Sequence, residues 1–181
     1  MAETKGLITD GWFSSDLQEW ETPAELFDVL NDRFQFNLDP CASPKNAKCD
    51  RFFTSDDDGL KQDWIGRVFM NPPYRDLADW IAKGVSEIKK GHCELLVTLT
   101  PARPDTIYFH EFFMRAKEIW FVKGRIPYIN PFKADEKKSP FPSMICIFDK
   151  VSLNGCPIVK SFDYKSLQLI KTRDSFLLDY F

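Results

Sequence analysis

The sequence predicts an α/β domain with a mostly parallel sheet, helices on both faces of that sheet and an antiparallel final strand. Short apolar runs alternate with segments of helical period through the centre of the chain, as in strand–helix–strand units. Polar residues follow several of these runs directly, which is where ligands of open α/β sheets collect. The last two predicted strands have no clear helix between them, and this favours an antiparallel pair.

The composition fits one globular domain of 181 residues, of which 44% are hydrophobic. Residues 1–20 form an N-terminal arm and residues 151–181 a C-terminal extension, to which the sequence assigns no role. No apolar run approaches the ~20 residues of a membrane span, and the first residues lack an apolar signal region. We therefore expect a cytoplasmic protein without a membrane partner; oligomeric state stays open.

Charge and cysteine content narrow the function classes. A net charge of −3 argues against a large nonspecific nucleic-acid surface, although a local basic patch is compatible with it. The five cysteines form no C-x-x-C pair, so the sequence predicts neither a disulfide scaffold nor a metal site.

The clearest helix covers residues 23–33. Thr22 is a suitable N-cap, Pro23 fits the first helical position, and Glu25 completes a capping box. One face of this helix is apolar, with Leu26, Phe27, Leu30 and Phe34. The elements expected next are short strands at 36–39 and 51–54, an acidic turn at 56–59 and one helical turn at 60–64.

The second half repeats the alternation of strands and helices. A strand at 67–70 is followed by a helix that Asp76 caps and that Lys89-Lys90-Gly91 ends. A near-continuous apolar strand at 94–100 stops at Pro101. The remaining expected elements are a helix at 105–116, with Ile107 among its inward residues, and strands at 119–122 and 144–148.

The strand at 67–70 ends abruptly in Asn71-Pro72-Pro73-Tyr74. Neither proline can continue a sheet ladder, so the turn is stiff and its carbonyls are free. The side-chain oxygen of Asn71 and the carbonyl of Pro72 can each accept one N–H bond from a planar exocyclic amine, while Tyr74 stacks on the ring that carries it. The alternative is a polyproline turn after a strand with a packed tyrosine.

With this motif, the chain resembles the phage DNA N6-adenine methyltransferases, small Dam-type enzymes that use S-adenosylmethionine. The resemblance runs from about Trp20 to Phe148. It rests on blocks that occur in order: Trp20-Glu21-Thr22-Pro23, Leu38-Asp39-Pro40-Cys41-Ala42, Asp58-Gly59-Leu60, Asn71-Pro72-Pro73-Tyr74, Pro101-Ala102-Arg103, Lys123-Gly124-Arg125 and Ser139-Pro140-Phe141-Pro142-Ser143-Met144. It implies a Rossmann-like class I methyltransferase domain over residues 1–181.

The resemblance also implies roles for individual residues. The catalytic residues that it implies are Asn71, Pro72, Pro73 and Tyr74. The turn of Asp39, Pro40, Cys41 and Ala42 is similar to the cofactor loop after the first strand, but Ser43-Pro44 stands where glycines are commoner. Glu21, Thr22 and Pro23 resemble the element that closes over the methionine end of the cofactor; otherwise Thr22 is only a helix cap.

For the adenosine end of the cofactor, the resemblance points to Asp58, since an acid after a strand often binds ribose hydroxyls or an adenine amine. Asp56 and Asp57 are alternatives, and an exposed acidic turn is the plain interpretation of all three. Asp39 could equally be a turn cap at a strand end.

The DNA partner would be bound mainly through a loop between the last two predicted strands. From Lys123 to Lys138 this loop has five basic residues against two acids, with aromatic residues interleaved. The candidate substrate-binding residues are Tyr74, Arg103, Lys123, Arg125, Lys137 and Lys138. An ordinary solvated loop is the competing interpretation.

Three other functions remain open on these residues. Asn-Pro-Pro-Tyr also serves methyltransferases that act on a glutamine amide in a protein, and RNA adenine presents the same amine as DNA adenine. From a different class, the chain could be a catalytically degenerate module that holds DNA without turnover.

Overall fold

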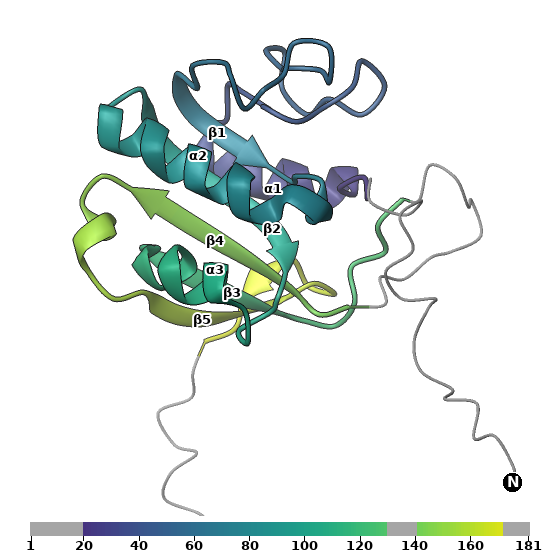
Figure 1. The fold of residues 1–181 in the computed structure, drawn as a ribbon. Coiled ribbons are helices and arrows are strands. Elements are labelled where there is room, and N and C mark those ends of the chain that lie inside the picture. The colour runs from purple at the N-terminus through teal and green to yellow at the C-terminus, as the bar shows by residue number, and fades with distance from the viewer. Residues whose placement is uncertain (1–19, 130–140, 172–181) are drawn as a thin grey trace, which may run out of the picture.

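The computed structural model describes residues 20–129 and 141–171. It contains a six-stranded mixed sheet in the order β1-β2-β4-β3-β5-β6 (Figure 1). The strands are β1 (Gly66–Met70), β2 (Cys93–Pro101), β3 (Glu118–Lys123), β4 (Ser143–Asp149), β5 (Ile158–Asp163) and β6 (Gln168–Leu169). The helices are α1 (Ala24–Phe34), α2 (Leu77–Lys90) and α3 (Ile107–Glu111), with 3-10 turns η1 (Tyr74–Asp76), η2 (Phe113–Arg115) and η3 (Ser152–Asn154).

The strand directions correct part of the prediction. β1 pairs with β2 in parallel and β3 pairs with β5 in parallel, whereas β4 lies antiparallel between β2 and β3. Thus β1, β2, β3 and β5 run in one direction, and the antiparallel pairing of β3 with β4 is confirmed. However, β4 is neither the last strand nor at an edge of the sheet. The C-terminal extension supplies β5 and β6, which the sequence analysis did not predict.

Both faces of the sheet carry helices, as predicted (Figure 1). On one face, α2 and α3 bury residues such as Trp80, Ile81 and Phe109 in one cluster with Val68 and Leu96. On the other face, the apolar side chains of α1 pack with alternate residues of the same strands, among them Phe69, Val97, Ile145 and Trp120. The alternation follows from the two-residue period of a strand, which sends successive side chains to opposite faces.

The predicted strands at 36–39 and 51–54 are present only as single parallel bridges. Leu38 pairs with Val68, and Asp39 pairs with Phe52. The amide of Phe69 donates to the carbonyl of Leu38 at 3.0 Å, and the amide of Phe53 donates to the carbonyl of Asp39 at 3.0 Å. These bridges extend the sheet beyond β1, so Asp39 lies beside the end of β1.

Two local predictions about helices are wrong. The helix expected at 105–116 is broken into α3 and η2, and Ile107, expected to point inward, is 77% exposed. The N-cap of α1 is Pro23 rather than Thr22, and no side-chain hydrogen bond caps this helix. The structure instead uses the Thr22 hydroxyl in the site described below. None of the helices in the described residues is long and apolar enough to cross a membrane.

Candidate active site

A pocket opens where β1 and the bridged segment at Asp39 end. Because both run in the same direction, their carboxyl ends lie at the same end of the sheet, where ligands of α/β folds usually bind. Most of its lining comes from four segments, and the lining residues of these are 20–22, 39–43, Thr54 with Ser55, Asp58 and Gly59, and Asn71 with Pro73. Asn46, Lys48, Phe69 and Trp80 complete the lining. The pocket brings together nine of the candidate site residues: Glu21, Thr22, Asp39, Pro40, Cys41, Ala42, Asp58, Asn71 and Pro73. Pro23 and Pro72 are buried and are not among its lining residues.

The side chain of Asn71 is held in one orientation. Its amide nitrogen Nδ2 donates to the backbone carbonyl of Trp20 at 2.5 Å and to the hydroxyl Oγ1 of Thr22 at 3.1 Å. A carbonyl can only accept, so the group that faces Trp20 must be the NH₂ group and not the amide oxygen. The amide oxygen of Asn71 therefore points away from Trp20 and Thr22, and it accepts a 3.4 Å hydrogen bond from the hydroxyl of Tyr74.

Tyr74 begins η1, the first turn after the two prolines, and is not among the residues that line the pocket. Its ring meets the ring of Phe141 edge-on, with centroids 5.3 Å apart. Burial, and then the neighbouring Tyr128, raise the pKa of Tyr74 well above its usual value. The hydroxyl of Tyr74 thus stays protonated at neutral pH and acts as a donor to Asn71.

Asp39 is a buried carboxylate, 5% exposed, at the floor of the pocket. It accepts hydrogen bonds from two backbone amides, of Lys48 at 3.2 Å and of Cys41 at 3.4 Å. Burial raises the pKa of Asp39 to about 6, and the hydrogen bonds only partly oppose this. The pocket therefore holds a carboxyl group that is costly to ionise.

Cys41 follows Asp39 by two residues and lines the same pocket. Burial, and then the charge of Asp39, hold the pKa of the Cys41 thiol well above its usual value, although a hydrogen bond with the Asn71 backbone opposes them. The thiolate is the nucleophilic form of cysteine. Cys41 is accordingly a neutral group of the pocket wall at neutral pH.

Of the three acids in the turn at 56–58, only Asp58 lines the pocket. It has a left-handed backbone (φ 53°) and pairs with Lys61 at 2.7 Å. Asp57 instead closes its own turn, accepting from the amide and hydroxyl of Thr54 at 2.8 and 2.7 Å. Asp56 is exposed outside the pocket lining. The geometry thus favours Asp58 among the alternatives.

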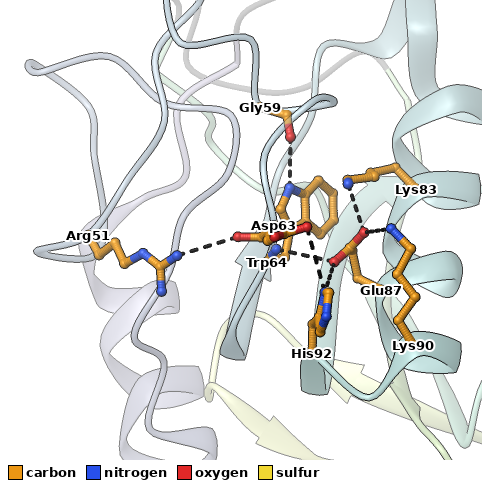
Figure 2. Close-up of polar contacts among 8 residues, drawn as sticks. All are labelled: Arg51, Gly59, Asp63, Trp64, Lys83, Glu87, Lys90 and His92. Carbon is orange, nitrogen blue, oxygen red and sulfur yellow. Dashed lines mark hydrogen bonds and ion pairs between the residues drawn. The ribbon is translucent and has the colours of Figure 1, made fainter.

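A buried network that the sequence analysis missed supports the wall beside Asp58 (Figure 2). The indole nitrogen of Trp64 donates to the carbonyl of Gly59 at 2.8 Å, and the ring of Trp64 stacks on Trp80, whose side chain lines the pocket. Gly59 is required there, because a Cβ atom would lie 2.0 Å from the carbonyl oxygen of Pro40. The two pocket segments around Pro40 and Gly59 are therefore in direct contact.

The carboxylate of Glu87, in α2, contacts the backbone amide of Trp64 (Figure 2). This fully buried carboxylate binds the side chains of Lys83 at 2.7 Å, Lys90 at 2.8 Å and His92 at 2.9 Å, and lies 3.4 Å from the amide of Trp64. Burial would raise the pKa of Glu87, but these three hydrogen bonds outweigh it and lower the pKa to about 2. The available sequence signal was the spacing on one helix face, since Glu87 lies four residues after Lys83 and three residues before Lys90.

Of the predicted DNA-contacting residues, Arg103, Lys123 and Arg125 do not line the pocket. Lys123 and Arg125 are exposed at the end of β3, around a shallow hollow shared with Asp163 and Lys165. Lys123 lies 3.9 Å from Asp163. Arg103 is half-buried after β2. Lys137 and Lys138 fall outside the described residues.

Comparison with known proteins identifies the family. A family model for DNA N-6-adenine-methyltransferase (Dam) matches residues 13–174. The chain is 32% identical over 164 residues to the DNA N-6-adenine-methyltransferase of Haemophilus phage HP1, covering 88% of this chain and 92% of that protein. It is 31% identical over 109 residues to the DNA N-6-adenine-methyltransferase of Escherichia phage T1, covering 58% of this chain and 44% of that protein. It is 38% identical over 64 residues to the putative methyltransferase YfdM of Escherichia coli K12, covering 31% of this chain and 70% of that protein. With this match across most of its length, the chain belongs to the DNA N-6-adenine-methyltransferase (Dam) family.

Proposed function

We propose that the protein transfers a methyl group from S-adenosylmethionine to the exocyclic N6 amine of adenine in DNA. Membership of the adenine methyltransferase family supports the reaction. The observation that carries the site assignment is the fixed orientation of Asn71, whose amide oxygen is turned away from Trp20 and Thr22 toward Tyr74. An oxygen held in this way is ready to accept a hydrogen bond from an amine.

Asn71 and Pro72 then act on the target amine. The amide oxygen of Asn71 and the carbonyl of Pro72 each accept one of its N–H bonds, so that the nitrogen lone pair is withdrawn from the ring and becomes available for methylation. The electrophile needs no activation by the protein, so the protein contributes orientation and hydrogen bonds. No covalent intermediate is needed, in accord with the high pKa of the Cys41 thiol.

The pocket around Asp39 has the donor and acceptor set that S-adenosylmethionine requires. Among the described residues, Asp39 accepts hydrogen bonds from two backbone amides and, at 4.0 Å, from the neutral thiol of Cys41, so an ammonium group of a ligand could still pair with this buried carboxylate. We assign Asp39 to the amine of the cofactor's methionine part, and Asp58 to the ribose or adenine, with Glu21, Pro40, Cys41 and Ala42 as the surrounding wall. When bound, the cofactor supplies a sulfonium methyl group that is already electrophilic.

The adenine must leave its base stack to reach Asn71. We assign Tyr74 to stack on it, a contact worth about 1–3 kcal/mol per base in other proteins. Because β1 and β3 run in the same direction, Lys123 and Arg125 follow the same, carboxyl-terminal end of the strands as Asn71 does. There they can contact the phosphate backbone. The roles of Arg103, Lys137 and Lys138 in DNA binding stay predictions.

We further propose that the fold is a Rossmann-like class I methyltransferase domain. Two features support this assignment: four of the strands run in one direction with helices on both faces, and the pocket lies at their carboxyl ends.

The test is methyl transfer from labelled S-adenosylmethionine to unmethylated DNA, followed by nucleoside analysis. We expect the label in N6-methyladenine. Asn71→Ala should lower the rate by about 100-fold or more, the usual effect of removing a positioned transition-state hydrogen bond. Cofactor affinity of this variant, measured by calorimetry, should change less than twofold.

Asn154→Ala serves as the matched control, because Asn154 is exposed in η3, away from the pocket. It should keep the wild-type rate. Full activity of Asn71→Ala would refute the assigned site, and label found only in RNA or in a protein glutamine would refute the assigned substrate.

A further inference from the structure

Thr22 and Trp20 reach Asn71 from a distant part of the chain. The two acceptors of the Asn71 NH₂ group come from residues 49 and 51 positions earlier in the sequence. Thr22 is 2% exposed and Trp20 is 7% exposed. On sequence grounds, Thr22 has two candidate roles, a helix cap and a cofactor contact. Its hydroxyl caps no helix, so its hydrogen bond to Asn71 is the interaction that needs an explanation.

The acceptors are held by elements other than β1. The backbone of Glu21, between them, pairs with Ile129 through hydrogen bonds in both directions at 3.0 and 3.2 Å. The ring of Trp20 packs edge-on against Tyr128 and Phe141, with centroids 6.1 and 5.8 Å away. The acceptors are therefore fixed independently of the strand that carries Asn71.

The NH₂ group of Asn71 has two N–H bonds, and each finds one of these acceptors. A reversed amide would place the Asn71 oxygen against the carbonyl oxygen of Trp20, so Trp20 excludes the wrong orientation. Thr22 then fixes the tilt of the amide plane, because it binds the second N–H. Without the Thr22 hydroxyl, a half-buried N–H would lose its partner and the side chain would be free to rotate toward another.

We infer that Thr22 is a positioning residue for methyl transfer: with the Trp20 carbonyl, its hydroxyl orients the Asn71 amide so that the amide oxygen faces the target amine. The inference rests on the proposed function of Asn71. It gives Thr22 a role in the chemical step rather than in cofactor binding, although Thr22 also lines the cofactor pocket.

The experiment compares Thr22→Val, which keeps the shape and removes the hydroxyl, with Thr22→Ser, which keeps the hydroxyl. Single-turnover rates are measured at saturating DNA and S-adenosylmethionine, and cofactor affinity is measured separately by calorimetry. We expect Thr22→Val to slow methyl transfer about tenfold or more while cofactor affinity changes less than twofold. Thr22→Ser should restore the rate to within about threefold of wild type.

Thr22→Ala, which adds no bulk, is the second variant without the hydroxyl and must show the same slow rate. Thermal unfolding of each variant identifies loss of folded protein. A normal rate in a folded hydroxyl-free variant would overturn the inference. So would a loss of cofactor affinity with a normal rate at saturation, which would return Thr22 to the cofactor site. Asn71→Ala run alongside separates the two proposals: if that variant is fully active, the proposed function of Asn71 fails as well.

Discussion

The pKa of Asp39 gives a quantitative prediction for stability and for cofactor binding. Among the described residues, no cationic side chain donates a hydrogen bond to this buried carboxylate. Burial raises its pKa to about 6 from the ordinary value of 3.8. A raised carboxyl pKa means that protonation favours the folded state. Its contribution to stability is complete below about pH 3.8 and is lost as the pH rises through about 6. The difference between these two pKa values corresponds to about 3 kcal/mol of destabilisation at neutral pH.

The same ionisation should control cofactor binding. If the ammonium group of S-adenosylmethionine pairs with ionised Asp39, only the ionised fraction of the protein binds. With a pKa of about 6, that fraction is roughly one tenth at pH 5 and nine tenths at pH 7, so the apparent affinity should rise about tenfold across this range. The α-carboxyl and α-amino groups of the ligand titrate outside this window.

Calorimetric titration of the cofactor at steps from pH 5 to pH 7 measures this rise. Asp39→Asn should bind more weakly at pH 7, and its affinity should be flat across the range, because the titrating group is gone. Unfolding of the cofactor-free protein over the same pH range should show the opposite trend, with stability falling as the pH rises. An unchanged pH dependence in Asp39→Asn, or a flat profile in the wild type, would refute the reasoning.

Two further predictions concern the wall of the pocket. Glu87 has its pKa lowered to about 2, so its contribution to stability is present above about pH 4.5 and is lost as the pH falls through 2. In urea unfolding between pH 5 and pH 2, the wild type should lose about 1–3 kcal/mol more stability than Glu87→Gln, after allowance for solvent screening. Gly59→Ala should greatly weaken cofactor binding, because its Cβ would lie 2.0 Å from the carbonyl oxygen of Pro40. Gly155→Ala, whose Cβ would make only an ordinary 3.5 Å contact, is the control, and equal cofactor affinities in the two variants would contradict this reasoning.

Elements with strong local signals could be predicted from the sequence. The apolar stripe of α2 and its stop at Gly91 agree with the structure, where Gly91 is the left-handed C-cap at φ 84°. The apolar run of β2 and the end of β1 at Asn71 are likewise as predicted. In each of these cases one short segment contains both the periodic pattern and its stop signal.

The strands at the far edge of the sheet could not be predicted in the same way. β5 has little apolar alternation to detect, because Ile158 and Val159, on opposite faces of the strand, are both about 60% exposed. The insertion of β4 between β2 and β3 is a matter of tertiary pairing, which hydrophobic period does not encode.

The same distinction between local signals and long-range contacts applies to the candidate site. The residues of each motif were found because they are adjacent in sequence. The use of Thr22 was misassigned because a good N-cap residue before a proline predicts a cap, whereas its partner Asn71 is 49 residues away. Long-range hydrogen bonds of this kind leave no periodic signal in a single sequence.

The two buried carboxylates among the described residues, Asp39 and Glu87, show how structure separates a structural acid from a candidate functional one. Glu87 is surrounded by Lys83, Lys90 and His92, so its charge is compensated within the fold and its pKa falls to about 2. Asp39 is also buried but accepts hydrogen bonds from backbone amides and the neutral Cys41 thiol rather than from cationic side chains, and its pKa rises to about 6. An acid that weakens the fold when ionised is expected where a cationic ligand completes the site. On this argument the ligand, rather than the rest of the chain, compensates the charge of Asp39.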